Sequence, residues 1–320
     1  MQKILSKNKL TSFLESLMKN NQVIAPVREA DGKASCFNII AKQDIKNLYL
    51  DKLTEVPFKQ FLIPENEILL KSTKGKLIER SDSKNKKNIV FGLRKCDLNA
   101  IKILDKIMHD SYYIKKRKNT ILLGLYCTNP DDSCFCNSME LEGVENCCDL
   151  FFYESNNNYY ISVFTKAGEN LVKNLPEAKR EVLLNIKNKK QLPNKEIENE
   201  YQNNAWEKDS NKCLSCAACT SYCPTCNCFD LKDNLDINLK DGERIRKQSS
   251  CQLKSFSRVA GGKVFRDSRL SRFKHFVYHK ISYFKKSTGR YMCVGCGRCL
   301  RVCPTKIDWV ETINSIKRGK

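Results

Sequence analysis

CLSCAACTSYCP at residues 213–224 returns as CVGCGRCLRVCP at residues 293–304, with every cysteine at the same spacing. Each run places two residues between its first three cysteines, three residues before the fourth, and a proline directly after it. Three thiolates at this spacing can wrap one iron–sulfur cubane, whereas the fourth is displaced and usually binds the other cluster of a pair. The two runs therefore predict two [4Fe-4S] clusters.

The expected ligand sets cross between the two runs. The first set is Cys213, Cys216, Cys219 and Cys303, and the second set is Cys293, Cys296, Cys299 and Cys223. This crossing requires the two loops to meet in the fold, although 70 residues separate Cys223 from Cys293. The long insertion favours a mostly helical two-cluster domain over the compact hairpin of small ferredoxins. A zinc ribbon is the alternative, but zinc uses two separated cysteine pairs and fits a run of four poorly.

The composition indicates a folded protein of a reducing compartment. With 320 residues, 41% of them hydrophobic, the chain can form one large or two ordinary domains, which excludes the disordered and collagen-like classes. No apolar run is long enough for a membrane-spanning helix, and the first residues lack the apolar core of a secretory signal. We therefore expect a cytoplasmic protein without membrane association, whose 18 cysteines serve as metal ligands rather than as disulfides.

The chain is strongly basic, with 57 Lys and Arg against 36 Asp and Glu, for a net charge of +21. Because lysine and asparagine are spread along the whole chain, the first interpretation is a solvated surface. Docking of an acidic partner protein is a second interpretation, and nucleic-acid binding is a weaker third.

The periodicity divides the chain into an N-terminal α/β domain, residues 1–205, and a cluster domain, residues 206–320, which gives an α+β fold class. Residues 9–19 read as an amphipathic helix, and residues 149–164 as a hairpin. The run NIVFGL at 88–93, a helix capped by Asp97, and TILLGL at 120–125 form a strand–helix–strand unit. The boundary is placed in the charged, asparagine-rich segment 176–205. Between the cysteine runs we expect a basic, partly helical stretch, with a helix over 269–284.

Four further cysteines follow the two predicted strands. Because the carboxyl ends of parallel strands meet at one sheet edge, we expect these thiols to converge there. The members of this third set are Cys96, Cys127, Cys134 and Cys136. The helix that begins beside Cys96 would lower the pKa of its thiol. The set predicts a possible third iron–sulfur cluster, with buried, redox-idle cysteines as the alternative.

Other catalytic signals are missing from the sequence. The three histidines show no ligand spacing with carboxylates, and neither G-x-G-x-x-G nor G-x-x-x-x-G-K-[ST] occurs. We therefore predict no catalytic residue, and the expected chemistry is electron transfer. Three interpretations stay open for Cys226, Cys228 and Cys251: ligands of a supplementary metal site, groups in the outer sphere of a cluster, or cysteines without a role.

Several segments together resemble the family of beta subunits of cytoplasmic sulfhydrogenases and its relative, the A component of anaerobic sulfite reductase. They are IAPV (24–27), FGLRKCDLNAIKILD (91–105), CFC (134–136), CLSCAACTSYCPTCNCFD (213–230), the stretch 244–251, VAGGKVFR (259–266) and CVGCGRCLRVCP (293–304). The resemblance covers residue 22 to the end and also gives weight to the third set and to Cys226, Cys228 and Cys251. Ala217 stands where the family usually has glycine, and the usual tryptophan before Ser250-Cys251 is missing.

The resemblance implies an iron–sulfur subunit that relays electrons between a flavin- and NAD(P)-binding partner protein and a hydrogenase or sulfite reductase catalytic subunit. Because no Ser-Asp-Thr-Asp stretch follows residue 30, the hydrogenase type is favoured. Two other classes compete with this non-catalytic, electron-transferring role: a basic, metal-stabilised nucleic-acid-binding protein, and a self-sufficient reductase.

Overall fold

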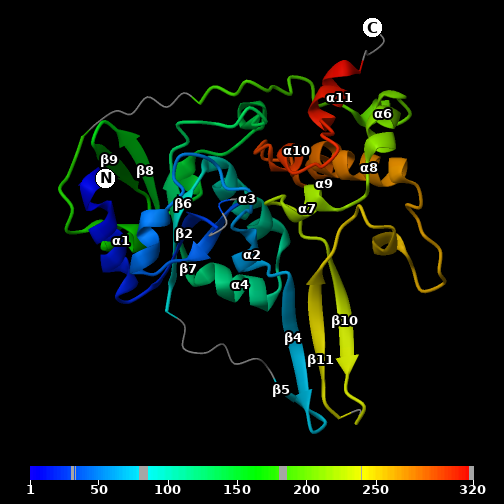
Figure 1. The fold of residues 1–320 in the computed structure, drawn as a ribbon, viewed down its shortest axis with the longest axis horizontal. Helices are drawn as coiled ribbons and strands as arrows, with labels where there is room; N and C mark the ends of the chain where they lie inside the picture. The colour runs from blue at the N-terminus through cyan, green and yellow to red at the C-terminus, as the bar shows by residue number, and fades with distance from the viewer. Residues whose placement is uncertain (30–31, 33, 79–85, 180–185, 239, 317–320) are drawn as a thin grey trace.

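The computed structural model describes residues 1–320 except 30–31, 33, 79–85, 180–185, 239 and 317–320. It has an α+β fold, as the sequence predicts, with an N-terminal sheet and its helices on one side and the C-terminal helices on the other (Figure 1). Part of the predicted boundary segment 176–205 lies outside the described residues, and a boundary at residue 205 stays a prediction. Among the described residues, no helix is both long and apolar enough to cross a membrane.

The larger sheet has seven strands in the order β1-β9-β8-β7-β6-β2-β3. Their bounds are β1 (Gln2–Ser6), β2 (Gln22–Arg28), β3 (Ser35–Ile39), β6 (Asn88–Leu93), β7 (Thr120–Leu125), β8 (Leu150–Ser155) and β9 (Asn158–Val163). The neighbours β2, β6, β7 and β8 run parallel, and the outer pairs are antiparallel. The predicted strand–helix–strand unit and the predicted hairpin are both confirmed.

Helices cover both faces of this sheet. Their bounds are α1 (Leu10–Met18), α2 (Lys59–Leu62), α3 (Lys95–Ile107), α4 (Ser111–Lys118) and α5 (Lys166–Val172). Alternate residues of β6 point to opposite faces, so that Phe91 packs in the core with α1 and Val90 in the core with α3. Burial on both faces explains why β6 and β7 are continuous apolar runs.

The start of α3 differs from the prediction. We expected Asp97 to cap this helix, but the helix begins at Lys95 with Arg94 at the cap position. Asp97 instead lies in the first turn, where its carboxylate accepts a hydrogen bond from the Arg94 N–H (3.3 Å). Its other oxygen faces Arg298 of the second cysteine run.

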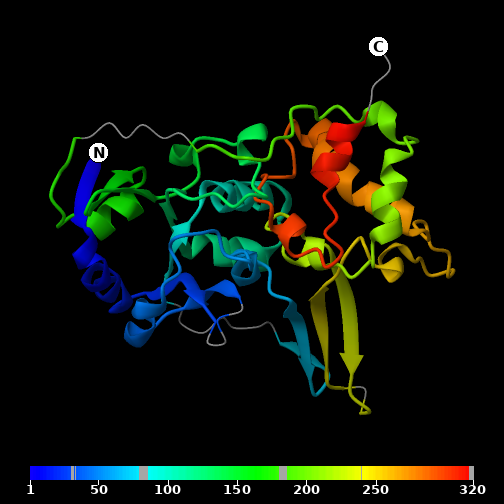
Figure 2. The ribbon, with the colours of Figure 1, turned by 45° about the horizontal axis from the view of Figure 1, so that its top comes forward.

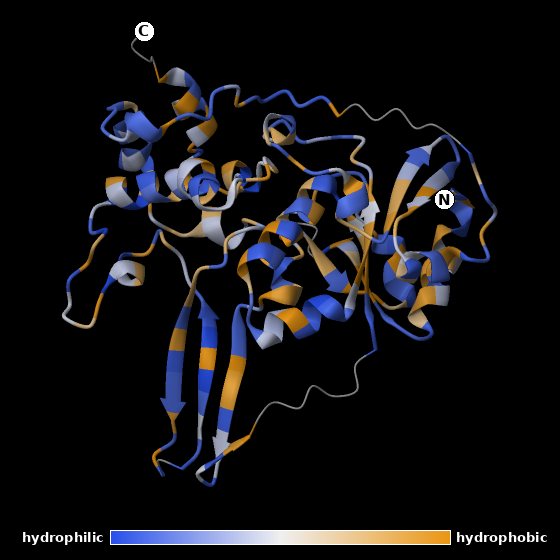
Figure 3. Ribbon diagram, turned by 180° about the vertical axis from the view of Figure 1, so that it is seen from behind, coloured by the Kyte–Doolittle hydropathy of each residue, from blue (hydrophilic) through white to orange (hydrophobic). Residues whose placement is uncertain are grey.

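A second sheet forms an antiparallel arm, in the order β10-β11-β4-β5, that extends away from the body of the molecule (Figures 1 and 2). Its strands are β4 (Asn66–Thr73), β5 (Lys76–Ile78), β10 (Phe229–Leu235) and β11 (Gly242–Gln248). Polar and apolar residues are interspersed along the arm (Figure 3). The sequence analysis missed β10 and β11 and expected a partly helical stretch there. Because β4 pairs with β11, chain from both sides of the predicted boundary builds one sheet.

The C-terminal region is otherwise mainly helical. Its helices are α6 (Ala205–Lys212), α7 (Ala218–Ser221), α8 (Arg269–Tyr278), α9 (Phe284–Thr288), α10 (Arg298–Arg301) and α11 (Trp309–Ser315). A π-helical turn, His279–Tyr283, joins α8 to α9 in the predicted helix over 269–284. Trp206, Val277 and Val310 are completely buried in the core that these helices share.

Candidate iron–sulfur sites

The first set of cysteines surrounds one pocket. Cys213, Cys216 and Cys219 of the first run line this pocket, and Cys303 of the second run closes it. The other walls are largely apolar and include Phe273 and Ile307. The structure therefore brings together the four cysteines that the sequence analysis assigned to the first set.

The second set surrounds a neighbouring pocket. Cys293, Cys296 and Cys299 line this pocket together with Cys223 of the first run. Cys299, Phe276 and Trp309 line both pockets, so the two cavities adjoin. The structure thus places Cys223 beside the second run and Cys303 beside the first, as the expected crossing requires, and cluster binding by these two cysteines stays a prediction.

The two cysteine loops present their backbones in the same way. Ser215 and Ala217 have left-handed backbones (φ 52° and 68°), as do Gly295 and Gly297 (φ 65° and 70°). The Ser215 N–H donates to Cys213 Sγ and the Gly295 N–H to Cys293 Sγ, both at 3.4 Å. Backbone N–H groups directed at thiolate sulfurs are a recurring feature of iron–sulfur sites and help to set their potentials.

The chemistry of the donors suits iron–sulfur clusters. Within the described parts of the chain, no three His, Cys, Asp or Glu side chains lie close enough to bind one metal ion together. In a cubane each of the four thiolates binds a different iron atom, so the sulfurs stand around a cage. The two pockets, with four cysteines, apolar walls and N–H donors each, therefore fit [4Fe-4S] clusters.

The third set gathers at the carboxyl edge of the larger sheet. Cys127 and Cys136 line a pocket of about 570 Å³, while Cys96 and Cys134 are buried. Burial raises the pKa of all four thiols, and the charge of Cys136 raises the pKa values of Cys96 and Cys134 further. Cys127 acts on Cys136 in the same way. Cys127 and Cys136 thus line one pocket, with Cys96 and Cys134 buried. The expected lowering of the Cys96 pKa by the helix start is wrong, because burial dominates.

The loop that carries Cys134 and Cys136 packs directly on the second cysteine run. The Phe135 N–H donates to the Gly295 carbonyl (2.8 Å), and the Cys134 thiol donates to the Cys296 carbonyl (3.5 Å). A Cβ atom at Gly295 would lie 2.6 Å from the Cys136 backbone, so only glycine allows this approach. The third set therefore adjoins the second set, and the second set lies between the other two.

Two buried polar groups near the third set have nitrogen atoms without a hydrogen-bond partner among the residues that the structure describes. The Asn188 Oδ1 accepts a hydrogen bond from the Cys136 thiol (3.4 Å), while its Nδ2 has no partner in the structure. The charge of Arg301 lowers the pKa of Cys134, against the larger raising effect of burial, and two of the Arg301 guanidinium nitrogens are also unpartnered. Such donors would suit an anionic group held by the third set.

Arg298 anchors the second cysteine run to the N-terminal sheet. Its side chain is fully buried and forms an ion pair with Asp97 of α3 (2.7 Å). It also donates to the Thr54 carbonyl (2.8 Å) and hydroxyl (3.1 Å). The sequence analysis missed this role.

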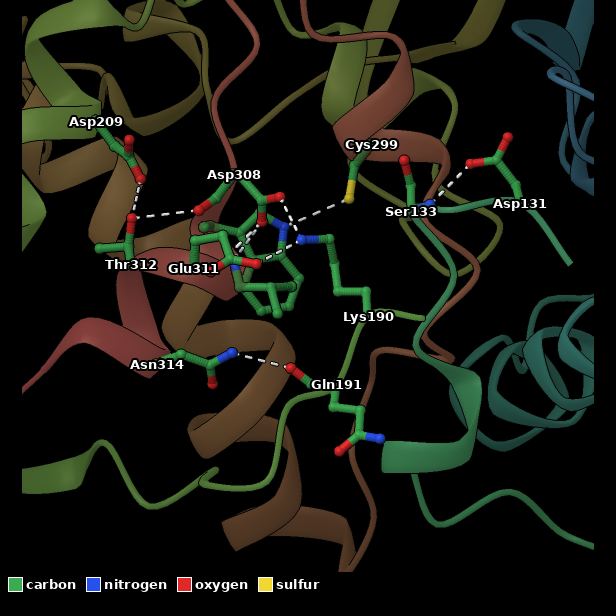
Figure 4. A network of polar contacts seen from close by, with 12 residues as sticks. Asp131, Ser133, Lys190, Gln191, Asp209, Cys299, Asp308, Glu311, Thr312 and Asn314 are labelled. Atoms are coloured by element: carbon green, nitrogen blue, oxygen red, sulfur yellow. Dashed lines mark hydrogen bonds and ion pairs between the residues drawn. The ribbon is translucent and has the colours of Figure 1, made fainter. Parts of the chain in front are cut away.

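Trp309 at the start of α11 contacts the second set. Its indole N–H donates to Cys299 Sγ (3.4 Å). Figure 4 shows Cys299 beside the polar network in which Lys190 pairs with Asp308 (2.8 Å) and Glu311 (2.6 Å). These ion pairs hold the start of the helix, and hence the indole, against the cluster pocket.

Two buried lysines lie beside the three cysteines left without a role. The ammonium group of Lys59 donates to the Cys226 carbonyl (2.9 Å), and that of Lys280 donates to the Thr225 hydroxyl (2.8 Å). A hydrogen bond from Cys251 lowers the pKa of Cys228 to about 6, and the charges of both lysines contribute. The sequence analysis left Cys226, Cys228 and Cys251 open and overlooked both lysines.

The comparisons with known proteins agree with this geometry. Residues 212–307 match the 4Fe-4S dicluster domain family, so the chain contains an iron–sulfur domain of that kind. The chain is similar to sulfhydrogenase 2 subunit beta of Pyrococcus furiosus, with 32% identity over 96% of each chain. No solved structure matches the chain. At this identity and coverage, the chain belongs to the family of sulfhydrogenase beta subunits.

Proposed function

We propose that the chain is the iron–sulfur electron-transfer subunit of a multi-subunit hydrogenase of the sulfhydrogenase type. The observation that carries the proposal is the pair of adjoining pockets, each of which is lined by the first three cysteines of one run and by the fourth cysteine of the other. The relative from Pyrococcus furiosus is named as a subunit, which supports partner subunits for this chain. The proposal places the complex in the cytoplasm.

The first and second sets would each hold one cluster. Bound there, a [4Fe-4S] cluster supplies one-electron redox chemistry. The cysteines fix its position, and the N–H groups of Ser215 and Gly295 donate to the ligand sulfurs. Phe276 and Trp309 line both pockets, so the space between the two pockets is filled by apolar rings.

We extend the proposal to a third cluster held by Cys96, Cys127, Cys134 and Cys136. Its support is the gathering of the four thiols and the two unpartnered donors beside them. Because the third set adjoins the second, the three sites would form a line across the protein. The route would be completed by a flavin- and NAD(P)-binding partner at one end and by the catalytic subunit of a hydrogenase at the other.

Iron content of anaerobically purified protein tests the number of clusters. We expect about 12 iron atoms per chain, and about 8 in a Cys134→Ser variant, because a cubane holds four irons. Cys36→Ser is the matched control, because Cys36 is a buried cysteine of β3 outside all three sets. A parent protein with about 8 iron atoms would remove the third cluster, and a colourless zinc protein would remove the whole proposal.

The co-purifying proteins test the partners. Capture with a flavoprotein and a hydrogenase catalytic subunit is the expected result. Capture with a sulfite reductase catalytic subunit would instead assign the chain as the A component of an anaerobic sulfite reductase. Retention on nucleic acid with a steep salt dependence would favour the nucleic-acid-binding class.

A further inference from the structure

The two cluster pockets are built alike, and one of them contains a buried cation. Both have the left-handed loop positions, and both have a threonine hydroxyl against the fourth cysteine: Thr225 at Cys223 (3.2 Å) and Thr305 at Cys303 (3.5 Å). Lys280 lines the second pocket. The described residues that line the first pocket include no lysine or arginine. Two arginines lie just outside the first pocket, where Arg269 donates to the Cys213 carbonyl (3.1 Å) and Arg272 to the Ser215 hydroxyl (3.2 Å). The pockets therefore differ in that, among the described residues, only the second has a cation in its lining.

Lys280 is fixed to the second set at both of its ends. Its side chain is only 2% exposed, and its ammonium group donates to the Thr225 hydroxyl (2.8 Å), which itself contacts Cys223 Sγ. Its carbonyl accepts hydrogen bonds from the backbone N–H groups of Met292 (3.1 Å) and Cys293 (3.3 Å). Lys280 therefore contacts the chain at both Cys223 and Cys293.

The second pocket supplies the negative charge that a buried ammonium group requires. Among the residues that the structure describes, no carboxylate lies within ion-pair distance of the Lys280 ammonium. A buried cation without a compensating anion is strongly unfavourable, so the cysteine sulfurs take the place of a carboxylate partner.

A local irregularity of the helix carries Lys280. It lies in the π-helical turn His279–Tyr283, which interrupts the helix formed by α8 and α9. Single π-turns inside α-helices widen the helix locally, change the direction of the side chains, and occur frequently at functional sites. The Lys280 carbonyl binds the cluster loop and its ammonium group reaches Thr225 from within this turn.

We propose that Lys280 makes the second set the more easily reduced of the two, so that electrons pass from the first set to the second. This inference rests on the proposed function, since it requires clusters at both sets. Reduction adds one negative charge to a cluster, and a nearby cation in a medium of low dielectric constant stabilises that charge. The Trp309 hydrogen bond to Cys299 acts in the same direction. Lys280 is a positioning residue that acts on the cluster through charge.

Redox titration of the intact parent protein, followed by electron paramagnetic resonance, tests the order of the two potentials. Cys216→Ser and Cys296→Ser variants assign the signals, because each changes a ligand of one set. The signal of higher potential is expected to be the one altered by Cys296→Ser. If Cys216→Ser alters it instead, the proposal is overturned without any lysine variant.

Substitution of Lys280 tests the cause. In Lys280→Met, the equilibrium constant for reducing the second cluster should fall at least tenfold, or 59 mV for one electron, while the first cluster is unchanged. Lys280→Arg should restore the potential of the parent, because it keeps the charge. Lys274→Met is the matched control: Lys274 is a buried lysine of α8 that lies over the Tyr201 ring and lines neither cluster pocket.

Each outcome decides the inference. Unchanged potentials in Lys280→Met, or equal shifts of both clusters, would overturn it. If Lys280→Met fails to hold iron, Lys280→Gln is used in its place. A second-cluster potential in Lys280→Gln equal to that in Lys280→Arg would count against a role of the charge. A parent protein without iron and acid-labile sulfide would instead remove the proposed function itself, which distinguishes the two failures.

Discussion

Asp97→Asn isolates the ion pair that joins the N-terminal sheet to the second cysteine run. Asp97 is 3% exposed, and Arg298 is completely buried, with 2.7 Å between the paired atoms. Asparagine keeps the size of the side chain and one oxygen acceptor but removes the negative charge. The Arg298 guanidinium would then be buried with only neutral oxygen acceptors, those of Thr54 and of the new asparagine, as partners.

The expected loss of stability is about 3 kcal/mol. Removal of one partner from a buried ion pair costs about 3–5 kcal/mol, because the remaining charge is left uncompensated. The lower end applies because both Thr54 hydrogen bonds survive. Asp233→Asn is the matched control, since Asp233 and Arg244 form a pair that is 54% and 47% exposed. An exposed pair contributes about 0–1 kcal/mol.

Anaerobic urea unfolding of the cluster-loaded protein, followed by circular dichroism, measures the free energy of unfolding. Visible absorbance gives a second readout, since Arg298 lies between Cys296 and Cys299. We expect the cluster absorbance of Asp97→Asn to decrease at lower urea than in the parent. If Asp97→Asn and Asp233→Asn both stay within about 1 kcal/mol of the parent, the buried pair contributes no more than a surface pair and the reasoning fails.

Two further substitutions test packing and titration. Gly297→Ala should lower both iron content and thermal stability, because the new Cβ would lie 2.5 Å from the carbonyl oxygen of Ser133. Gly261→Ala should lower neither, because a Cβ at Gly261 meets nothing within 4 Å. If the two variants behave alike, the close approach of the second cysteine run to Ser133 is contradicted. Burial lowers the pKa values of His275 and His279 to about 4. Between about pH 6.5 and pH 4 the unfolded chain therefore binds protons that the folded chain does not. The free energy of unfolding decreases as the pH is lowered through this range. Replacing both histidines by glutamine should flatten this dependence in urea unfolding, while substitution of the exposed His109 should leave it unchanged.

The sequence predicts best where one local pattern determines the structure. Residues 88–93 and 120–125 are apolar on both faces, and only a strand buried between two layers requires that pattern, so both strands were predicted with correct bounds. The crossing of Cys223 and Cys303 followed in the same way from the offset of the fourth cysteine.

The arm was missed because its strands lack such a pattern. All side chains of β10 are exposed, so neither face of the strand had to be apolar. Leu231 and Leu235 alternate with Lys232 and Asn234, but charged Asp230 and Asp233 lie on both faces. The strand forms a local hairpin with β11, and β11 pairs in turn with β4. The pairing of β11 with β4 joins segments that are distant in the sequence, so no short window encodes it.

Of the two site residues that were not predicted, Arg298 and Lys280, only Lys280 has a signal in the sequence. Arg298 depends on Asp97, which is 201 residues away, and one arginine among 57 basic residues carries no local signal. Lys280 does carry one, because it lies in the apolar stretch FVYHKISYF, residues 276–284. A lysine surrounded by aromatic residues on a helix must either reach solvent or meet an anion. The cysteine runs on both sides of this helix predict negatively charged clusters, so a cluster is the anion that this lysine is expected to meet. Burial of the ammonium group against the second set is therefore the physical requirement that this sequence pattern expresses.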